Sequence, residues 1–217
     1  MKVEPLRILV GCECSGVVRR AFTALGHDAW SCDLKPAADR SNRHIVGDVR
    51  DLLGEGWDLL AVLHPPCTRL TNSGVRWLSV PPPGRTRDEM WAELDAGAAL
   101  FSDCWNAPIE RIAVENPVMH KHAKARIRNY QPFSQSVQPW WFGDDEAGPD
   151  NVKKRTCWWL KGLPKLTRTG TLEGSTARAE VHRMPPGPDR AERRSTFFPG
   201  MAAALAMAWA GDARGVA

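Results

Sequence analysis

Short apolar runs that end in a glycine, a proline or an acidic residue recur along the first half of the chain. Five of these runs have the length and composition of buried strands: 6–11, 28–34, 43–48, 57–66 and 110–117. Residues 17–25 and 88–105 instead carry apolar side chains at intervals of three and four, which is the period of a helix. Gly26 follows the first of these stretches, and glycine commonly ends a helix. The pattern therefore predicts strands that alternate with helices.

Alternation at this spacing predicts an α/β fold with a mostly parallel, doubly wound sheet, because right-handed crossovers join successive parallel strands. Ligands of such sheets bind at the carboxyl ends of the strands. We therefore expect the segments that follow the predicted strands to face one crevice. These segments are 11–16, Asp33, Asp48, 65–67 and 115–117.

Beyond residue 117 the pattern is less regular. Residues 133–143 and 154–160 predict a pair of strands, and four of the ten tryptophans gather there, at positions 140, 141, 158 and 159. These indoles either pack the strand pair on the sheet or stack unpaired bases, and we favour packing. Residues 197–210 predict a late, alanine-rich helix.

The same pattern divides the chain into three parts. Residues 1–165 form the main domain, residues 166–194 form a short polar insert, and residues 195–217 form a C-terminal helical segment that packs back on the main domain. The insert is rich in turn-forming residues and too short to build a second core.

The composition predicts a protein that does not cross a membrane and stays in the cytoplasm. Hydrophobic residues make up 43% of the 217 positions, yet no apolar run approaches the roughly 20 residues that span a bilayer. The start, MKVEPLRILVG, has charges and a proline where a signal peptide needs an unbroken apolar stretch. The six cysteines are then expected to be reduced thiols. His64 and Cys67 make half of a zinc site at most, so we expect no metal.

Charge is distributed unevenly along the chain. Residues 151–217 contain twelve Lys and Arg against five Asp and Glu, which gives +7 and leaves −3 for residues 1–150. The basic segment could hold a polyanion through its phosphates. The plain alternative is an ordinary solvated basic surface.

The loop GCECSG, at residues 11–16, has the form of a ligand-binding turn between a strand and a helix. Gly11 and Gly16 would let a ligand approach the backbone and the helix N-terminus, with Glu13 and Ser15 beside it. An ordinary connecting loop is the alternative interpretation.

Two acids follow the next predicted strands. Asp33 stands where a carboxylate would bind the two ribose hydroxyls of a nucleoside cofactor. Asp48 could reach an adenine amino group. Either acid could instead cap the helix that follows it, and Asp33 is the better candidate for binding.

Cys67 follows two prolines at the end of the most apolar predicted strand. Pro65 and Pro66 fix the backbone and exclude a helix, while the strand delivers the thiol to the crevice. A nucleophile needs such a placement, although a lone buried cysteine is more often a small hydrophobic residue. Trp77, in the loop that follows, is a candidate for contact with a substrate, because this loop could close over the site.

The segment VENP places a carboxylate and a carboxamide at the end of the neighbouring strand. Glu115 in a partly closed pocket could act as an acid or as a hydrogen-bond donor, with Asn116 beside it. The alternative is an acid at the start of a helix. A cysteine in the same crevice favours chemistry.

The order of these segments resembles that of the DNA cytosine-5 methyltransferases. ILVGCECSG, Asp33, the GD at 47–48, PPC at 65–67, ENP at 115–117 and KKRTCWWL follow one another over roughly residues 7–160. The resemblance implies a Rossmann-like fold that binds S-adenosylmethionine, with residues 1–165 as the catalytic domain. The helix at the C-terminus then resembles the one that packs beside the cofactor.

The resemblance also assigns roles to residues. Those around S-adenosylmethionine would be Gly11, Glu13, Ser15, Gly16, Asp33, Asp48 and Pro65. The catalytic residues would be the nucleophile Cys67, its partner Glu115, and Arg155, which would touch the pyrimidine. The substrate would also contact Pro66, Trp77, Asn116 and Lys154.

The activity that the resemblance implies is methyl transfer to carbon 5 of cytosine through a covalent Cys67 adduct, with DNA favoured as the substrate. Carbon 5 is too electron-poor to attack a sulfonium methyl group, so a thiolate must first add at carbon 6. Glu115 would bond ring nitrogen 3 and the amino group and so stabilise the added electron density. In a duplex the cytosine would also have to be flipped out of the stack.

The insert at 166–194 is much shorter than the target-recognition region of family members that read a defined DNA sequence. Sequence readout would then be poor, or supplied by a protein partner. Alternatively the substrate is cytosine in RNA, in single-stranded DNA or in a free deoxycytidine nucleotide. A further interpretation is a non-catalytic protein of the same fold that binds nucleic acid or a protein partner.

Overall fold

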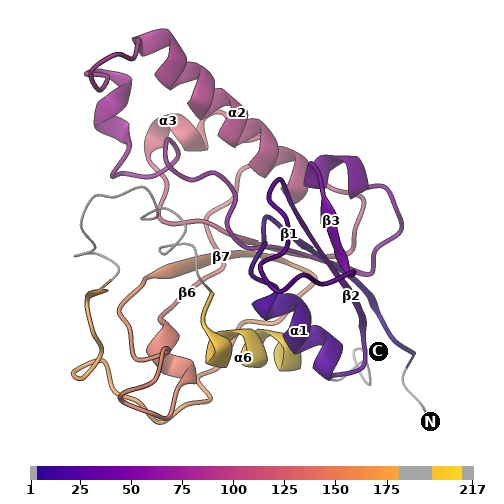
Figure 1. Ribbon diagram of the computed structural model, residues 1–217. Helices are drawn as coiled ribbons and strands as arrows, with labels where there is room; N and C mark the ends of the chain where they lie inside the picture. Colours follow the sequence, from indigo (N-terminus) through magenta and orange to yellow (C-terminus); the bar gives the residue numbers. More distant parts are fainter. Residues whose placement is uncertain (1–3, 181–196, 212–217) are drawn as a thin grey trace.

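A computed structural model describes residues 4–180 and 197–211, in which seven strands form one sheet (Figure 1). The strands are β1 (Arg7–Gly11), β2 (Asp28–Asp33), β3 (His44–Val46), β4 (Leu59–Val62), β5 (Arg111–Glu115), β6 (Gln135–Val137) and β7 (Thr156–Lys161). Their order across the sheet is β3-β2-β1-β4-β5-β7-β6. The first five strands are parallel, and β7 is antiparallel to both of its neighbours. The prediction of an α/β fold with a mostly parallel sheet is confirmed.

Helices cover both faces of this sheet. Among the described residues they are α1 (Val17–Ala24), α2 (Arg87–Trp105), α3 (Lys121–Lys124) and α6 (Pro199–Ala210), with the 3₁₀ turns η1 (Val49–Leu52), η2 (Val75–Leu78) and η3 (Pro139–Phe142). In Figure 1, α1 and α6 lie below the sheet, and α2 lies above it with α3. The strand order reverses between β1 and β4, which is compatible with a Rossmann-like sheet. No helix within the described ranges is long and apolar enough to cross a membrane.

The core forms two layers, because successive side chains of a strand point to opposite faces of the sheet. The face covered by α1 and α6 is lined by Ile8, Val10, Leu59, Ala61, Ala113 and Trp158. The face covered by α2 is lined by Leu9, Leu60, Val62, Ile112, Val114 and Trp159. Each central strand is therefore buried on both sides, which explains why its sequence is a continuous apolar run.

Helix α2 begins where its first residues predict. The hydroxyl of Thr86 accepts a hydrogen bond from the Glu89 N–H, and the Glu89 carboxylate accepts one from the Thr86 N–H at 2.6 Å. This reciprocal pair satisfies two of the N–H groups that a helix start leaves without partners.

The predicted strand pair exists, but it is shorter than expected. β6 and β7 pair antiparallel, whereas residues 139–142 form the 3₁₀ turn η3 instead of continuing a strand to residue 143. Pro139 explains the difference, since it cannot donate to a ladder and favours the first turn of a helix. Trp158 and Trp159 are fully buried and pack on the sheet, as we favoured, whereas Trp140 and Trp141 are half-buried. Residues 181–194 of the expected insert lie outside the described residues.

The loop before β7 is joined to α6 by one carboxylate. The residue that precedes α6, Phe198, offers no side-chain oxygen to its N–H groups. Asp150 takes this place, because its Oδ1 accepts a hydrogen bond from the Gly200 N–H at 2.9 Å. Only glycine fits at position 200, because a Cβ there would lie 2.2 Å from the carbonyl oxygen of Phe142.

Replacing Asp150 by alanine should lower the free energy of unfolding by about 1–2 kcal/mol, since the start of α6 loses an acceptor and a negative charge. Asp150→Asn retains an acceptor oxygen and should lose less. Urea unfolding followed by circular dichroism measures both losses. An alanine variant as stable as the wild type would contradict this role for Asp150.

Candidate functional site

Parallel pairing brings the candidate segments to one edge of the sheet. β1 ends at Gly11, β2 at Asp33 and β5 at Glu115, and β4 lies between β1 and β5. Because the carboxyl ends of parallel strands share an edge, the loop at 11–16 and the turn at 65–67 lie there too. We call this the carboxyl edge.

The loop at 11–16 folds around the carboxylate of Glu13, which is only 2% exposed. Oε1 of Glu13 accepts hydrogen bonds from the Ser15 hydroxyl and from the Val18 N–H. Oε2 is buried without a hydrogen-bond partner. Cys12 has a φ of 56°, a left-handed conformation that is uncommon for a residue with a side chain and concentrates at functional sites.

The two glycines of this loop have different surroundings. At Gly11 a Cβ would come within 2.7 Å of Val49, so glycine allows the close approach of η1. Gly16 has a φ of 70°, and the space beside it is filled by the side chains of Arg19 and Asp39. Those two side chains form an ion pair at 2.5 Å, in which the arginine is nearly buried. Gly16 thus serves the turn and does not line an open cradle.

Asp33 at the end of β2 and Asp48 after β3 differ in the number of partners that their carboxylates already have. Asp33 is half-buried, and its carboxylate accepts one hydrogen bond, from the Lys35 N–H at 3.0 Å. Asp48 caps η1 through the Arg50 N–H at 2.9 Å and also forms an ion pair with the Arg50 guanidinium, which holds the pKa of Asp48 below its usual range. The capping alternative is thus observed for Asp48, and Asp33 has more capacity to bind a ligand.

Pro65 and Pro66 carry the chain beyond the end of β4 into a tight turn. The carbonyl oxygen of Cys67 accepts hydrogen bonds from the next residues of the turn, the Leu70 N–H at 2.9 Å and the Thr71 N–H at 3.2 Å. Pro65 is buried, Pro66 is exposed and Cys67 is half-buried. The turn approaches α2 at Gly97, where a Cβ would lie 3.1 Å from the carbonyl oxygen of Pro66.

This turn is bound to the segment that follows β5. His120 donates its N–H to the carbonyl oxygen of Leu70 at 3.0 Å, and its ring Nε2 lies 2.6 Å from the carbonyl oxygen of Arg69. Nδ1 of the same ring accepts the Ala123 N–H, so Nε2 is the donor toward Arg69. The guanidinium of Arg69 adds an ion pair with Glu93 of α2 at 2.7 Å. The turn that holds Cys67 is therefore fixed between α2 and the continuation of β5.

Glu115 lies at the end of β5 and is 4% exposed. Its Oε2 is 3.7 Å from Nδ1 of His64, which is three residues before Cys67. Burial lowers the pKa of His64 more strongly than its neighbour Glu115 raises it, so the imidazole is neutral at pH 7. Asn116 is completely buried, and neither oxygen nor nitrogen of its side-chain amide has a partner.

Several buried polar atoms without partners gather around Glu115. They belong to Glu13 (Oε2), His64 (Nε2), Asn116 (Oδ1 and Nδ2) and Trp158 (Nε1). Trp158 lies directly opposite Glu115 in the β5–β7 ladder, and Phe197 contacts both the Trp158 and the His64 rings. We call Glu13, His64, Glu115, Asn116 and Trp158 the polar cluster. Buried polar groups are nearly always paired, so this cluster is the best candidate for a ligand-binding site.

Lys154 and Arg155 are neighbours in sequence but lie on opposite sides of the sheet. The Lys154 ammonium lies 5.5 Å from the Phe198 ring centroid, and its charge helps to lower the pKa of His64. The Arg155 guanidinium donates to the Ser136 hydroxyl at 3.0 Å and lies over Phe133, which packs with the α2 face. The structure thus brings Lys154 toward the polar cluster and does not bring Arg155 there.

Trp77 lies in η2 and is half-buried, with the Arg76 guanidinium 4.1 Å from its ring centroid. The sequence analysis did not assign His64 and Trp158 to the binding site. It noted His64 only as half of a zinc site and Trp158 only among the tryptophans that pack or stack bases. His64 had a signal, since it ends the same apolar run as the prolines and precedes Cys67 by three residues. No signal in the sequence placed Trp158 beside Glu115, because only the pairing of β7 with β5 brings these two residues together.

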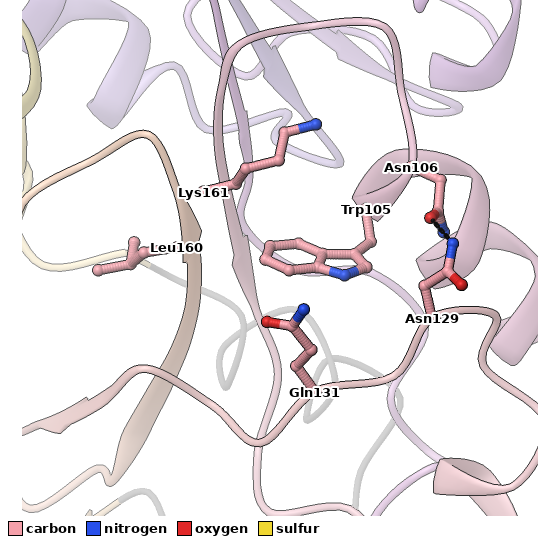
Figure 2. Close-up of a pocket in the computed structure, with 6 residues that line it drawn as sticks. All are labelled: Trp105, Asn106, Asn129, Gln131, Leu160 and Lys161. Carbon is pink, nitrogen blue, oxygen red and sulfur yellow. Dashed lines mark hydrogen bonds between the residues drawn. The ribbon is translucent and has the colours of Figure 1, made fainter.

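A hollow of about 430 Å³ lies at the opposite edge of the sheet, beside the end of β7 (Figure 2). Figure 2 shows the Trp105 indole with Lys161, Gln131 and two asparagines around it. The asparagines bond each other, from Asn129 Nδ2 to Asn106 Oδ1 at 2.7 Å, and Lys161 donates to the Ala107 carbonyl oxygen. Because these polar groups are already satisfied, we favour the polar cluster over this hollow.

The described residues contain no group of three or more His, Cys, Asp or Glu side chains that could hold a metal ion. All six cysteines fall within the described ranges, and none is in a disulfide. Comparison of the chain with models of protein families and with curated proteins gave no match.

Alkylation of the native protein should label Cys14 and Cys67 first, because both are half-buried whereas Cys32, Cys104 and Cys157 are buried. Cys12 is also half-buried, but burial raises the pKa of its thiol well above the usual value, so it should react more slowly. Burial raises the pKa of Cys32 to about 11 and that of Cys104 to about 12, so at pH 8 roughly one thiol in a thousand or fewer is ionised at either. Peptide mass spectrometry after iodoacetamide treatment measures the order. Labelling of Cys32 or Cys104 as fast as Cys67 would contradict the burial described here, and labelling of all six in urea is the control.

Proposed function

We propose that the protein transfers a methyl group from S-adenosylmethionine to carbon 5 of cytosine, with DNA as the favoured substrate. The proposal includes a Rossmann-like methyltransferase fold and a covalent adduct at Cys67. One observation carries it: the turn that holds Cys67 is bound to the segment after Glu115, beside buried polar groups that lack partners.

The polar cluster suits a pyrimidine in its hydrogen-bonding capacity. The edge of cytosine offers a ring nitrogen that accepts, an amino group that donates and a carbonyl oxygen that accepts. Glu115 and Asn116 together supply carboxyl oxygens, an amide oxygen and an amide N–H, and the Trp158 indole adds another donor. A flat ring that binds there would satisfy groups that are costly to leave unpaired.

The residues at the carboxyl edge also fit the nucleoside and amino-acid parts of S-adenosylmethionine. Asp33 has carboxylate capacity for ribose hydroxyls, and the buried Oε2 of Glu13 can accept from an ammonium group. Gly11 and Pro65 lie at the same edge of the sheet, at or just beyond the ends of β1 and β4. When bound, the cofactor supplies an electrophilic methyl group to carbon 5.

The chain's own residues perform the remaining steps. The Cys67 thiolate forms a bond to carbon 6, and the electrons of the 5,6 double bond move toward carbon 5 and nitrogen 3. Glu115 donates a proton to nitrogen 3 and holds the amino group, which stabilises the adduct. After carbon 5 is methylated, a base removes its proton, the carbon–sulfur bond breaks and Glu115 recovers its proton. The turn made by Pro65 and Pro66 matters because a misplacement of about 1 Å can reduce the rate roughly a hundredfold.

The part of the insert that is described adds no separate recognition domain. Residues 166–180 lie along the loop before β7, where Arg178 pairs with Val152 and Leu172 is buried over Gly143. This observation favours a substrate that needs little sequence readout. Duplex DNA, single-stranded DNA, RNA and dCMP are therefore all included as substrates in the test.

Wild-type protein with tritiated S-adenosylmethionine should label a cytosine-containing substrate, and Cys67→Ser should reduce the rate by about a thousandfold or more, since the nucleophile is lost. Thr68→Ala is the matched control, because Thr68 lies exposed in the same turn. Scintillation counting of the four substrates measures the rates and identifies the preferred polymer.

Two results would contradict the proposal. One is a wild-type protein that labels none of the four substrates, which would favour a non-catalytic protein that binds nucleic acid or a partner. The other is a Cys67→Ser variant as active as Thr68→Ala.

Asp33→Ala should weaken binding of S-adenosylmethionine about tenfold or more, through loss of a charged hydrogen-bond partner for the ribose. Asp48→Ala should weaken it less, because the Asp48 carboxylate is already paired with Arg50. Isothermal titration calorimetry measures both. A larger loss for Asp48→Ala would reverse the assignment of the two acids.

A further inference from the structure

His64 is the one imidazole of the polar cluster, and its contacts lead to Glu115. It continues the line of β4, whose extension is fixed by a hydrogen bond from the Leu63 N–H to the Gly11 carbonyl oxygen at 3.0 Å. Nδ1 of the ring faces Oε2 of Glu115 at 3.7 Å, and the ring lies against Phe197 with centroids 5.8 Å apart. Its side chain is only 16% exposed.

We infer that His64 is a positioning residue for the proposed reaction: its Nδ1 holds the Glu115 carboxyl group in the orientation that faces the pyrimidine. This inference rests on the proposed function. It extends that function, because it gives a role to a residue that neither binds the cofactor nor attacks the ring.

The charges around the ring support a neutral imidazole. Three ionisable groups act on it: Glu115 from β5, Glu13 from the loop after β1, and Lys154 from the segment before β7. Burial outweighs the effect of the two glutamates and lowers the pKa of His64. A neutral imidazole has one donor nitrogen and one acceptor nitrogen.

The position of Glu115 then decides which nitrogen donates. Once Glu115 has given up its proton, its carboxylate can only accept, so Nδ1 then carries the ring hydrogen and Nε2 is the acceptor. Nε2 is buried and has no hydrogen-bond partner in the structure. This lone pair can accept from an N–H of the bound base or from an ordered water. The distance of 3.7 Å is longer than a direct hydrogen bond, and such contacts commonly shorten when substrate binds.

The function of Nδ1–H follows from the proton that Glu115 loses in the addition step. When the Cys67 sulfur bonds to carbon 6, Glu115 gives its proton to nitrogen 3 and becomes a carboxylate. Nδ1–H of His64 donates to that carboxylate, which is otherwise poorly solvated at 4% exposure. His64 itself gains and loses no proton, so no further reactant is required.

Two substitutions of His64 by an amide side chain distinguish the roles of the two ring nitrogens. In His64→Asn the amide takes the place of Nδ1, and in His64→Gln it takes the place of Nε2. We expect His64→Gln to lower kcat about 10- to 100-fold, since the carboxyl group loses its fixed orientation. His64→Asn should recover most of the rate. KM for S-adenosylmethionine and its binding by calorimetry should stay within about twofold of wild type in both variants, because His64 acts through Glu115 and not on the cofactor.

His122→Asn is the matched control, because His122 lies on α3 and contacts Trp91 and His120, outside the polar cluster. Thermal unfolding midpoints of all variants identify any loss that is only structural. The inference fails if His64→Asn and His64→Gln have equal kcat values, whether both match the wild type or both are reduced. If the wild type methylates no cytosine at all, the proposed function itself fails, and the inference falls with it.

Discussion

The fixed contact between the turn after β4 and the segment after β5 is the constraint on which the site depends. His120 makes this contact with two hydrogen bonds, to the carbonyl oxygens of Leu70 and Arg69. Cys67 lies in a turn outside the sheet, whereas Glu115 belongs to a buried strand, and this contact joins the two segments. Because the two segments in contact follow neighbouring parallel strands, the sheet and this contact together hold the turn in place. A reaction that needs a thiol and a carboxyl group on one small ring depends on this rigidity.

The polar cluster differs from the rest of the core in that its buried polar atoms lack hydrogen-bond partners. Elsewhere the described sheet buries apolar side chains on both faces, and polar groups such as those of Asp150 and His120 have partners. Oε1 of Gln138 is the exception outside the cluster among the described residues. At the carboxyl edge, side-chain atoms of Asn116 and Trp158 are buried without a hydrogen-bond partner. Leaving a buried polar group unpaired costs about 1–3 kcal/mol, so several in one place indicate a ligand that pairs them. At the hollow beside Trp105 the two asparagine side chains bond each other, so it lacks this indication of a ligand.

Much of the fold follows from local pattern, because strands buried on both sides are continuous apolar runs and helices have their own period. The sequence could therefore predict that Asp33, Cys67 and Glu115 follow strand ends. It could not predict the partners of these residues, which depend on how distant segments meet. The pairing of Asp48 with Arg50, the placement of Arg155 on the α2 face, and the contact of His64 with Glu115 are of this kind. Pro139 alone could have predicted the 3₁₀ turn that it starts, but the aromatic residues after it also favour a strand.

The central claim is that one pyrimidine meets Cys67 and Glu115 together. Incubation with S-adenosylmethionine and an oligonucleotide that contains 5-fluorocytosine tests it most directly, because fluorine at carbon 5 blocks the elimination that releases the thiolate. The account predicts a stable adduct whose mass maps to the peptide that contains Cys67, and predicts that Glu115→Gln forms it far more slowly. No adduct on an active enzyme, or an adduct at another cysteine, would contradict the account.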